Sequence, residues 1–290
     1  MLTRRSTYPP VLPWRSDLDG PPIPGAFPLP PDRLPLLRDG RALKRWRYVG
    51  AFGERVMLCI GFARVLGLPQ AWWAVWDRDA RRLRERTVFV RPGRAVRFAA
   101  GRATVRDGDC AIDLAIEEDA GVQTVCPHGD GYVWTRKQAA VAVRGTVRLA
   151  GEAIAIDTLG VVDDTAGYHD RHTAWRWSAG VGTAADGRIV GWNLVEGVND
   201  PPVRSERSVW IDGAAFEVGP VSFADDLGRV GFAEGGELRF AAEAVRERHD
   251  ELVVMRSDYA QPFGTFSGAL PGGVQLAAGW GVMEHHRARW

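Results

Sequence analysis

From about residue 44 onward the chain alternates between hydrophobic and polar positions in short runs separated by glycine-centred breaks. Examples are "ATVRDGDCAIDLAI", "VAVRGTVRLAGEAIAI" and "SVWIDGAAFEV". In "CAIDLAIE", the side chains of Cys110, Ile112, Leu114 and Ile116 point one way and that of Asp113 points the other, which is the pattern of a half-buried strand. Turn signals recur every eight to twelve residues without strand–helix alternation. The pattern predicts an all-β protein.

The number of candidate strands, more than twenty, is too large for one sheet to close on itself. We therefore predict two antiparallel lipocalin-like (calycin-type) barrels in tandem, with a boundary near "SAGVG". The predicted domains are an extended arm at 1–40, an N-terminal barrel at 41–180 and a C-terminal barrel at 181–290. The segment "AAEAVRERHDE" at 241–251 fits a helix and a hairpin with its turn near His249 about equally well.

The N-terminal arm is rich in proline. Ten of the eighteen prolines lie within residues 1–40, and proline fixes φ and removes an amide donor from any ladder. The segment also contains Trp14, Ile23, Phe27 and Leu29, so it is too apolar for a free linker. We expect it to lie along the body of the protein and cover apolar surface.

Composition excludes several classes of partner. The formal charge is +1, which gives no electrostatic reason to expect nucleic acid or an anionic membrane surface as a partner. No run of 18 apolar residues predicts a membrane span. Two of the 37 basic residues, Lys44 and Lys137, are lysine. This bias is more typical of genomic base composition than of an arginine-specific function.

Cysteine usage and the N-terminus favour a cytoplasmic location. Cys59, Cys110 and Cys126 are odd in number and lack C-x-x-C spacing, which argues against a disulfide framework and a thiolate zinc site. The first residues hold prolines where a signal peptide needs an apolar core. The sequence indicates no oligomeric state.

Candidate chemistry is densest in "DDTAGYHDRHTAWRWS" at 163–178. If 168–178 is a regular strand, one face carries Tyr168, Asp170, His172 and Arg176, and the other carries aromatic rings. A polar, ring-rich face is typical of a barrel interior that binds a ligand. We predict Asp170 as a general acid or base, His172 as its partner, and Tyr168 as the group that orients the substrate or carries a proton.

A structural role for the same carboxylate is the interpretation that the sequence slightly favours. Asp170 could pair with a nearby arginine, such as Arg171 or Arg176, at a barrel end. A carboxyl in an apolar cavity is pushed toward its neutral form, and an arginine close by opposes that shift. The distances that decide between the two interpretations are not in the sequence.

The motifs "GYHDRHTAWRWS", "GRIVGWNLVEGVND" and "GWGVMEHHRARW" resemble an uncharacterised bacterial family of domains of unknown function. That family is distantly similar to the AttH and carotenoid 1,2-hydratase group, which implies two lipocalin-like barrels. In the carotenoid hydratases a Gly, an aromatic residue and an Asp-His pair precede a Trp-bearing strand, and an Asp protonates an isoprenoid double bond without a cofactor.

The resemblance extends to several candidate residues but not to the complete pair. Gly167, Tyr168 and Asp170 match the first features of the motif, and the strand that follows carries tryptophans. Arg171 follows Asp170, however, and His172 comes one place later. Either the chemistry is lost or a different acid is used.

Aromatic residues support a ligand more than they support a reaction. Twelve tryptophans in 290 residues is a high content, and large rings provide apolar contact with little rotamer freedom to lose. The clusters at 72–76 and 175–177 are the candidate pocket walls, although core packing explains most single tryptophans. The ligand-binding candidates are Trp73, Trp175, Arg176, Trp177, Trp192 and Asn193.

We predict no metal and no organic cofactor. His169, His172 and His285 are weak metal candidates, with Glu284 and His286 nearby in the sequence, but the adjacent histidines 285 and 286 would point to opposite faces of a strand. The sequence contains no phosphate-binding loop, no G-x-S-x-G and no H-E-x-x-H.

Together these features predict an enzyme that binds an apolar small molecule, such as a lipid, isoprenoid or polyketide. The reaction would be an acid–base hydration, cyclisation or isomerisation. One alternative is a non-catalytic carrier with the same cavity. A second alternative is a protein-interaction module that uses the proline-rich arm.

Overall fold

The computed structural model describes residues 12–17, 28–252 and 255–289, and most of these residues lie in antiparallel strands. Within those ranges, eleven strands form the first sheet: β1 (Trp14–Arg15), β4 (Lys44–Phe52), β5 (Val56–Val65), β6 (Leu68–Asp77), β7 (Arg82–Val88), β8 (Val96–Ala99), β9 (Arg102–Asp107), β10 (Cys110–Ile116), β11 (Val122–His128), β12 (Gly131–Leu149) and β13 (Glu152–Gly167).

The second sheet has nine strands in the described part of the chain: β14 (His172–Ala184), β15 (Ile189–Glu196), β16 (Ser208–Ile211), β17 (Ala214–Glu217), β18 (Val221–Phe223), β19 (Arg229–Phe232), β20 (Glu237–Leu252), β21 (Met255–Leu270) and β22 (Val274–Arg289). A short hairpin pairs β2 (Leu37–Arg38) with β3 (Arg41–Ala42). The helical turns α1 (Pro92–Ala95) and η1 (Pro271–Gly273) are the longest helical elements described, and neither approaches the length and hydropathy of a membrane-crossing helix.

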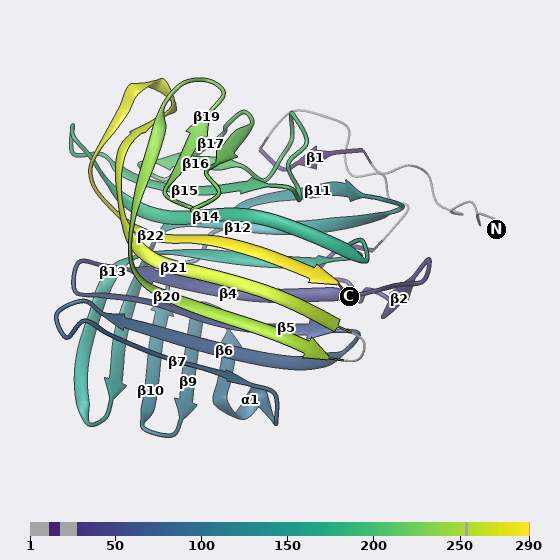
Figure 1. Ribbon diagram of the computed structural model, residues 1–290, viewed down its shortest axis with the longest axis horizontal. Helices are drawn as coiled ribbons and strands as arrows, with labels where there is room; N and C mark the ends of the chain where they lie inside the picture. Colours follow the sequence, from purple (N-terminus) through teal and green to yellow (C-terminus); the bar gives the residue numbers. More distant parts are fainter. Residues whose placement is uncertain (1–11, 18–27, 253–254, 290) are drawn as a thin grey trace.

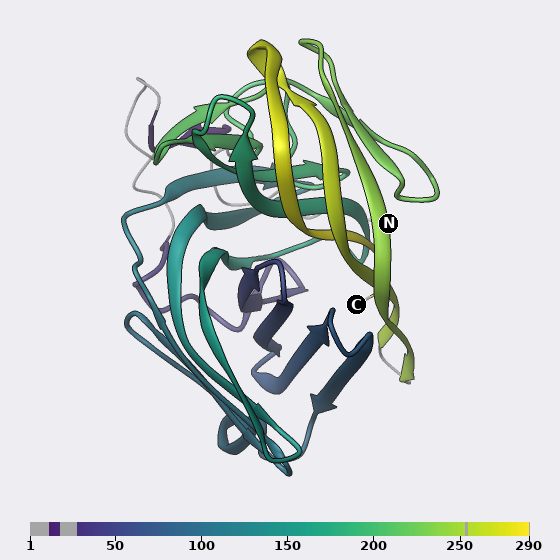
Figure 2. The same ribbon diagram turned by 90° about the vertical axis from the view of Figure 1, so that its left-hand side faces the viewer.

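Each sheet curls back on itself. The order in the first sheet is β7-β6-β5-β4-β13-β12-β10-β9-β8, with β11 on β12 and β1 on β11, and β8 lies against β5 and β6. The order in the second sheet is β17-β16-β15-β14-β22-β21-β20-β19-β18, and β18 lies against β15. The predicted fold class, all-β with two lipocalin-like barrels in tandem, is confirmed (Figures 1 and 2).

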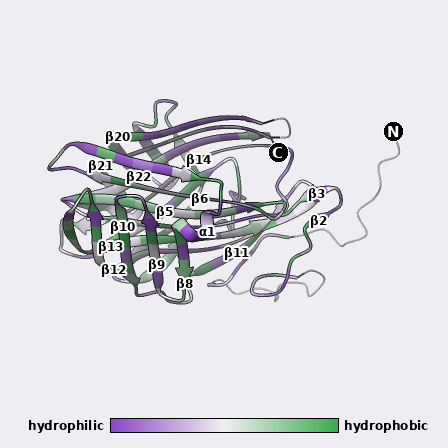
Figure 3. Cartoon of the chain, turned by 90° about the horizontal axis from the view of Figure 1, so that it is seen from below, coloured by the Kyte–Doolittle hydropathy of each residue, from purple (hydrophilic) through white to green (hydrophobic). Residues whose placement is uncertain are grey.

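Strand alternation builds three main cores. Along β4, Val49 and Ala51 point into the core of the first barrel, and Tyr48 and Phe52 point into the core between the sheets. The second barrel encloses a core of its own around Trp192. Figure 3 shows the resulting mixture of hydrophobic and hydrophilic segments along the strands of both sheets. Because successive side chains point to opposite faces, one strand supplies two cores at once.

The chain passes from the first sheet to the second between β13 and β14, through residues 168–171. The whole of β14 pairs within the second sheet. The boundary predicted near residue 180 therefore lies inside this strand, eight residues after its start. The division into independent domains stays a prediction.

The segment at 241–251 is a strand and not a helix. It belongs to β20, which pairs with β21 along its length. The hairpin alternative placed its turn near His249, but His249 lies within the strand pair, opposite Asp258 of β21. Pairing with β21 outweighs the local helix propensity of "AAEAVRERHDE".

The described parts of the arm contact the body of the protein. Strand β1 pairs with β11, and Trp14 and Leu29 pack against a small core that includes Tyr132. The buried guanidinium of Arg15 donates to the carbonyl oxygen of Ser205, at 2.7 Å. The remaining residues of the predicted arm, 1–11 and 18–27, with Ile23 and Phe27 among them, lie outside the described residues.

A row of glycines crosses the second sheet where its long strands curve. Gly180 of β14 is the cross-strand partner of Gly281 of β22, and Gly281 is also opposite Gly264 of β21. A Cβ atom on Gly281 would collide with the carbonyl oxygen of Ala179, and one on Gly264 with that of Ala241. The strands can follow this path only without side chains at these positions.

Candidate functional site

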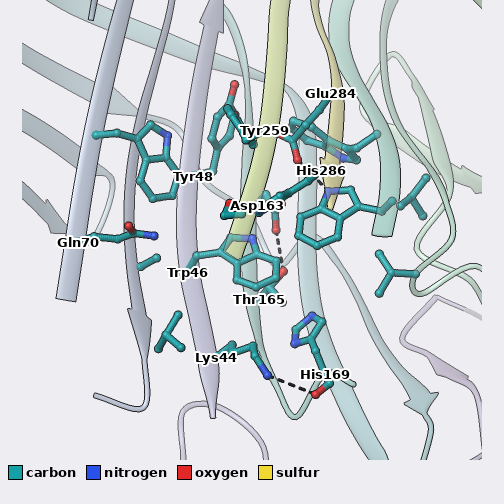
Figure 4. Close-up of a pocket in the computed structure, with 18 of the residues that line it drawn as sticks. Lys44, Trp46, Tyr48, Gln70, Asp163, Thr165, His169, Tyr259, Glu284 and His286 are labelled. Carbon is teal, nitrogen blue, oxygen red and sulfur yellow. Dashed lines mark hydrogen bonds between the residues drawn. The ribbon is translucent and has the colours of Figure 1, made fainter. Parts of the chain in front are cut away.

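A cavity of about 140 Å³ lies between the two sheets. Its walls come from β4, β5, β6, β7, β12 and β13 of the first sheet and from β14, β15, β20, β21 and β22 of the second (Figure 4). Six aromatic residues supply most of the apolar wall: Trp46, Tyr48, Trp72, Trp175, Trp177 and Tyr259. Rings from the two sheets face each other, with Trp46 stacked on Trp175 at 6.2 Å between ring centroids.

The first-sheet wall follows from the alternation in "KRWRY". Lys44, Trp46 and Tyr48 line the cavity, whereas Arg45 and Arg47 line a separate groove on the other side of β4. The period-2 pattern places a buried amine and two rings in a row on one face of this strand. Trp72 on β6 lies over Gly61 of β5, its cross-strand partner, which leaves room for the indole.

The second-sheet wall is formed by cross-strand pairs between β14 and β22. Trp175 is opposite His286, and Trp177 is opposite Glu284. The rings of Trp175 and His286 are 4.3 Å apart at their centroids, with their planes at 65°. One carboxyl and one imidazole are therefore held against two indoles.

Glu284 is a buried carboxyl whose hydrogen bonds come from uncharged donors. The indole Nε1 of Trp175 donates to Oε1 at 2.8 Å, and Nε2 of Gln261 donates to Oε2 at 2.8 Å. Among the described residues, no Lys or Arg side chain forms an ion pair with it. Burial raises the pKa of Glu284 to about 7, and hydrogen bonds from Trp175, Tyr259 and Gln261 lower it only in part.

His286 is a buried imidazole next to this carboxyl. A hydrogen bond of 2.8 Å joins its Nε2 to the hydroxyl of Ser257, and its ring packs edge-on against Tyr259 at 5.4 Å. Burial lowers the pKa of His286 to about 3, with a further contribution from the neighbouring His285. The ring is therefore neutral near pH 7.

The cavity wall also holds a buried charged cluster. The ammonium of Lys137 lies 2.7 Å from Asp163 and 3.3 Å from Glu206, and Nδ2 of Asn199 donates to Glu206 at 3.0 Å. Burial opposes the charge of Lys137, but Asp163 and Glu206 overcome that effect and raise its pKa. Lys44 lies closer to the edge of the sheet, and its ammonium donates to the carbonyl oxygen of His169 at 3.2 Å.

Asp170 does not face this cavity. It lies in the link between β13 and β14, where its carboxylate pairs with the guanidinium of Arg41. Its side chain is 41% exposed, and its Oδ2 is 3.9 Å from Nε2 of His128. The expectation of a dry, ring-lined environment for Asp170 is wrong because residues 168–171 are not part of a strand, so strand alternation does not orient them. The geometry favours the structural alternative, a pair with an arginine.

The two predicted partners of Asp170 also lie away from the cavity. His172 is exposed at the start of β14. Tyr168 is fully buried in the core beneath the arm, where its hydroxyl donates to the carbonyl oxygen of Pro35 at 2.8 Å. The structure does not bring these three residues together around a ligand-sized space.

The predicted ligand-binding residues differ in whether they line the cavity. Trp175 and Trp177 line the cavity, as the cluster at 175–177 suggested. Asn193 stands behind it, where its Oδ1 accepts a hydrogen bond from Nε1 of Trp177 at 2.8 Å. The other three lie elsewhere: Trp73 in the core of the first barrel, Trp192 in the core of the second barrel, and Arg176 in ion pairs with Glu196 and Asp225.

The metal candidates do not gather into a site. His169 is buried and lines the cavity, His172 is exposed, and His285 lies opposite Arg176. In the portion of the chain that the structure describes, no group of three His, Cys, Asp or Glu side chains is arranged to hold a metal ion.

Several cavity residues were not predicted as site residues from the sequence. The alternation in "KRWRY" sets Lys44, Trp46 and Tyr48 on one face of a strand. The pattern does not say which face of that strand is covered by a second sheet. Glu284 was considered only beside the metal candidates. The same alternation in "MEHHR" sets it and His286 on one face, apart from His285.

Comparisons with known proteins support the fold. A family model described as a domain of unknown function (DUF2804) matches residues 90–290. By sequence, no curated protein matches the chain.

Two solved structures are similar in fold. One is an AttH-like protein from Nitrosomonas europaea, with 14% identity, a TM-score of 0.53, and 90% of this chain and 98% of that chain covered. The other is kievitone hydratase from Nectria haematococca, with 10% identity, a TM-score of 0.55, and 83% and 88% covered. At these identities the likeness concerns the fold alone.

Proposed function

The chain belongs to the DUF2804 family, and we propose that it is an enzyme that binds an apolar small molecule between its two sheets. The ligand is a lipid, isoprenoid or polyketide, and the reaction is a hydration, cyclisation or isomerisation that needs only proton transfer. Glu284 is the proton donor and acceptor. We place this activity in the cytoplasm, where the three buried, free cysteines would stay reduced.

The observation that carries the proposal is the environment of Glu284. A carboxyl that is buried among indoles and held by neutral donors has a pKa of about 7, so both of its protonation states are populated near neutral pH. General acid–base catalysis is most effective when the pKa of the catalytic group lies near the working pH. An ion-paired carboxylate would stay ionised and could not donate a proton at that pH.

The aromatic wall supports the choice of ligand. Trp46, Trp175 and Trp177 offer flat apolar surface, and their rings are fixed by stacking and hydrogen bonds. Such surfaces bind rings and unsaturated chains with little loss of side-chain entropy. One protein of similar fold is named as a hydratase, which agrees with the proposed chemistry without demonstrating it.

The test begins with native mass spectrometry of the protein purified from its own host, which identifies the molecule that travels with it. Turnover of that molecule is then measured for the wild type and for Glu284→Gln. We expect Glu284→Gln to lose turnover by roughly 100-fold or more while ligand affinity changes little. A wild-type protein that binds the molecule but never converts it would contradict the proposal and favour the carrier. In that case the affinity loss should follow Trp175→Ala.

A further inference from the structure

The two lysines of the chain both line the cavity between the sheets. Arginine provides every other basic side chain among the 37, and many arginines occupy exposed positions or ion pairs, although Arg246 and Arg248 also line this cavity. Yet Lys44 and Lys137 are buried, at 2% and 3% exposure, and border the same cavity of about 140 Å³. Genomic base composition explains why lysine is rare, but it does not explain why both lysines lie at one site.

Lysine differs from arginine in one property that matters in a buried cavity. The guanidinium stays protonated in proteins, whereas an ammonium can lose its proton when it is desolvated and become a nucleophile. A cavity that needed only positive charge could use arginine, as this one does at the buried Arg246. Two buried lysines therefore point to a requirement for the amine itself at one of the two positions.

The surroundings distinguish the two amines. Lys137 lies between Asp163 and Glu206, which hold it in the charged form. The ammonium of Lys44 donates to two carbonyl oxygens, those of His169 at 3.2 Å and Ala42 at 3.5 Å. Carbonyl oxygens accept a hydrogen bond from a neutral amine as well as from an ammonium.

The charged groups near Lys44 largely offset one another. Burial and the positive charge of Arg41 lower the pKa of Lys44 to about 8, and the charge of Asp170 raises it only in part. Arg41 and Asp170 are paired with each other, and the neighbouring imidazoles of His128 and His169 have lowered pKa values, chiefly because they are buried. Asp170, the carboxylate that the sequence analysis proposed as the acid or base, is thus a charged neighbour of Lys44.

We propose that the cavity accepts a ligand with an aldehyde or ketone group, and that Nζ of Lys44 forms an imine with its carbonyl carbon. The neutral amine adds to the carbon, the carbonyl oxygen leaves as water, and a C=N bond replaces the C=O bond. From the ammonium form the balance is R₂C=O plus R′NH₃⁺ giving R₂C=NHR′⁺ plus H₂O. No oxidant or reductant is needed. The inference deepens the proposed function, because it rests on the same cavity and names the ligand class.

The sequence makes the covalent test unusually selective. The chain offers two lysine amines and one α-amino group as sites for an imine. We would incubate the protein at pH 7 with 2-naphthaldehyde, a flat aromatic aldehyde, and sodium cyanoborohydride, which reduces an imine to a stable secondary amine. Intact-mass measurement then counts the adducts, and peptide mapping assigns each one to a residue.

We expect Lys44 to be the lysine that is trapped, while the α-amino group, with an ordinary pKa of about 7.7–8.0, forms an adduct that peptide mapping assigns separately. Arg94→Lys provides a matched control, because Arg94 is exposed on α1 and its replacement introduces an ordinary lysine. An exposed lysine has a pKa of about 10.4 and is almost fully protonated at pH 7, so Lys44 should react roughly tenfold faster or more. Lys44→Arg keeps the positive charge and should remove the adduct.

The outcomes separate this inference from the proposed function. An adduct on Lys137, the absence of an adduct on Lys44, or a rate at Lys44 no greater than at residue 94 of Arg94→Lys would overturn it. The mapping needs only wild-type protein, so it stands if Lys44→Arg does not fold. Glu284→Gln should still be trapped at Lys44. If the imine is trapped at Lys44 but the host ligand is not turned over, the acid–base proposal alone is contradicted. If the host ligand is turned over but no imine is trapped at Lys44, the imine proposal alone is contradicted.

Discussion

Asp170 and Glu284 are two carboxyl groups in different surroundings, and the proposed proton transfer depends on the surroundings of Glu284. Asp170 is partly exposed and paired with Arg41 in a link between sheets. Glu284 sits on a strand, opposite an indole, with uncharged donors on both oxygens. Both lie in segments dense with histidine and tryptophan. A dense motif therefore does not identify a reactive acid, because the partner of the carboxyl decides its chemistry.

The largest expected difference between the two carboxyl groups is in turnover of the host ligand. Glu284→Gln should reduce kcat by 100-fold or more, and Asp170→Asn should change it by less than about threefold. In the wild type, kcat should show an inflection near pH 7, the pKa of Glu284. If Asp170→Asn is the variant that loses turnover, the roles assigned to the two carboxyls are reversed.

The next difference is in the pH dependence of stability. Because the pKa of Glu284 is raised to about 7, the folded state holds more protons than the unfolded state between about pH 4.3 and 7, so this group lowers stability as pH rises through that window. Glu284→Gln should therefore gain about 2–3 kcal/mol relative to the wild type between pH 5 and pH 8. Urea unfolding at the two pH values measures it. A pH-independent difference would contradict the buried, neutral carboxyl.

His286 should act in the opposite direction. Its pKa is lowered to about 3, so the unfolded state binds the proton first, and stability falls as pH drops below about 6.5. At pH 5 this amounts to about 2 kcal/mol. His286→Phe keeps an aromatic ring between Trp175 and Tyr259 and should remove most of that loss, as judged by thermal unfolding at pH 7.5 and 5. Equal acid sensitivity of variant and wild type would argue against a neutral imidazole.

The smallest expected effect is that of Asp170→Asn on stability. A pair between a half-exposed carboxylate and Arg41 contributes about 0.2–1 kcal/mol, and added salt should reduce that value. Urea unfolding in 50 mM and 500 mM NaCl, with Asp186→Asn as a control from another exposed pair, measures both effects. A loss of several kcal/mol that salt leaves unchanged would show that Asp170 is more deeply coupled to the fold than its exposure indicates.

The sequence allowed prediction of the fold because the barrels depend on local patterning. Period-2 alternation, as in "CAIDLAIE", appears directly as β10 with Ile112 and Leu114 in the core. The prediction failed where a residue left the pattern. The Gly167–His172 link interrupts the assumed strand, so the shared face of Tyr168 and Asp170 does not exist.

The site could be predicted only in part, since it forms between two sheets. Trp175 and Trp177 line the cavity, but alternation alone cannot tell a face that covers a barrel core from one that meets a second sheet. Trp73 and Trp192 are on strands with similar patterns and fill barrel cores instead. Lys44 and Glu284 are 240 residues apart, and no local signal reports that they border the same space.

The glycine row through Gly180, Gly281 and Gly264 constrains how this protein can diversify. Any larger residue there would push neighbouring backbones apart. Related sequences can therefore vary the side chains that line the cavity, but not the spacing of the strands that carry those side chains. New ligand preferences would then arise when aromatic and acidic residues are replaced at fixed positions on β14 and β22. Deep sequencing of a selected mutant library should show the glycines nearly invariant beside tolerant neighbours.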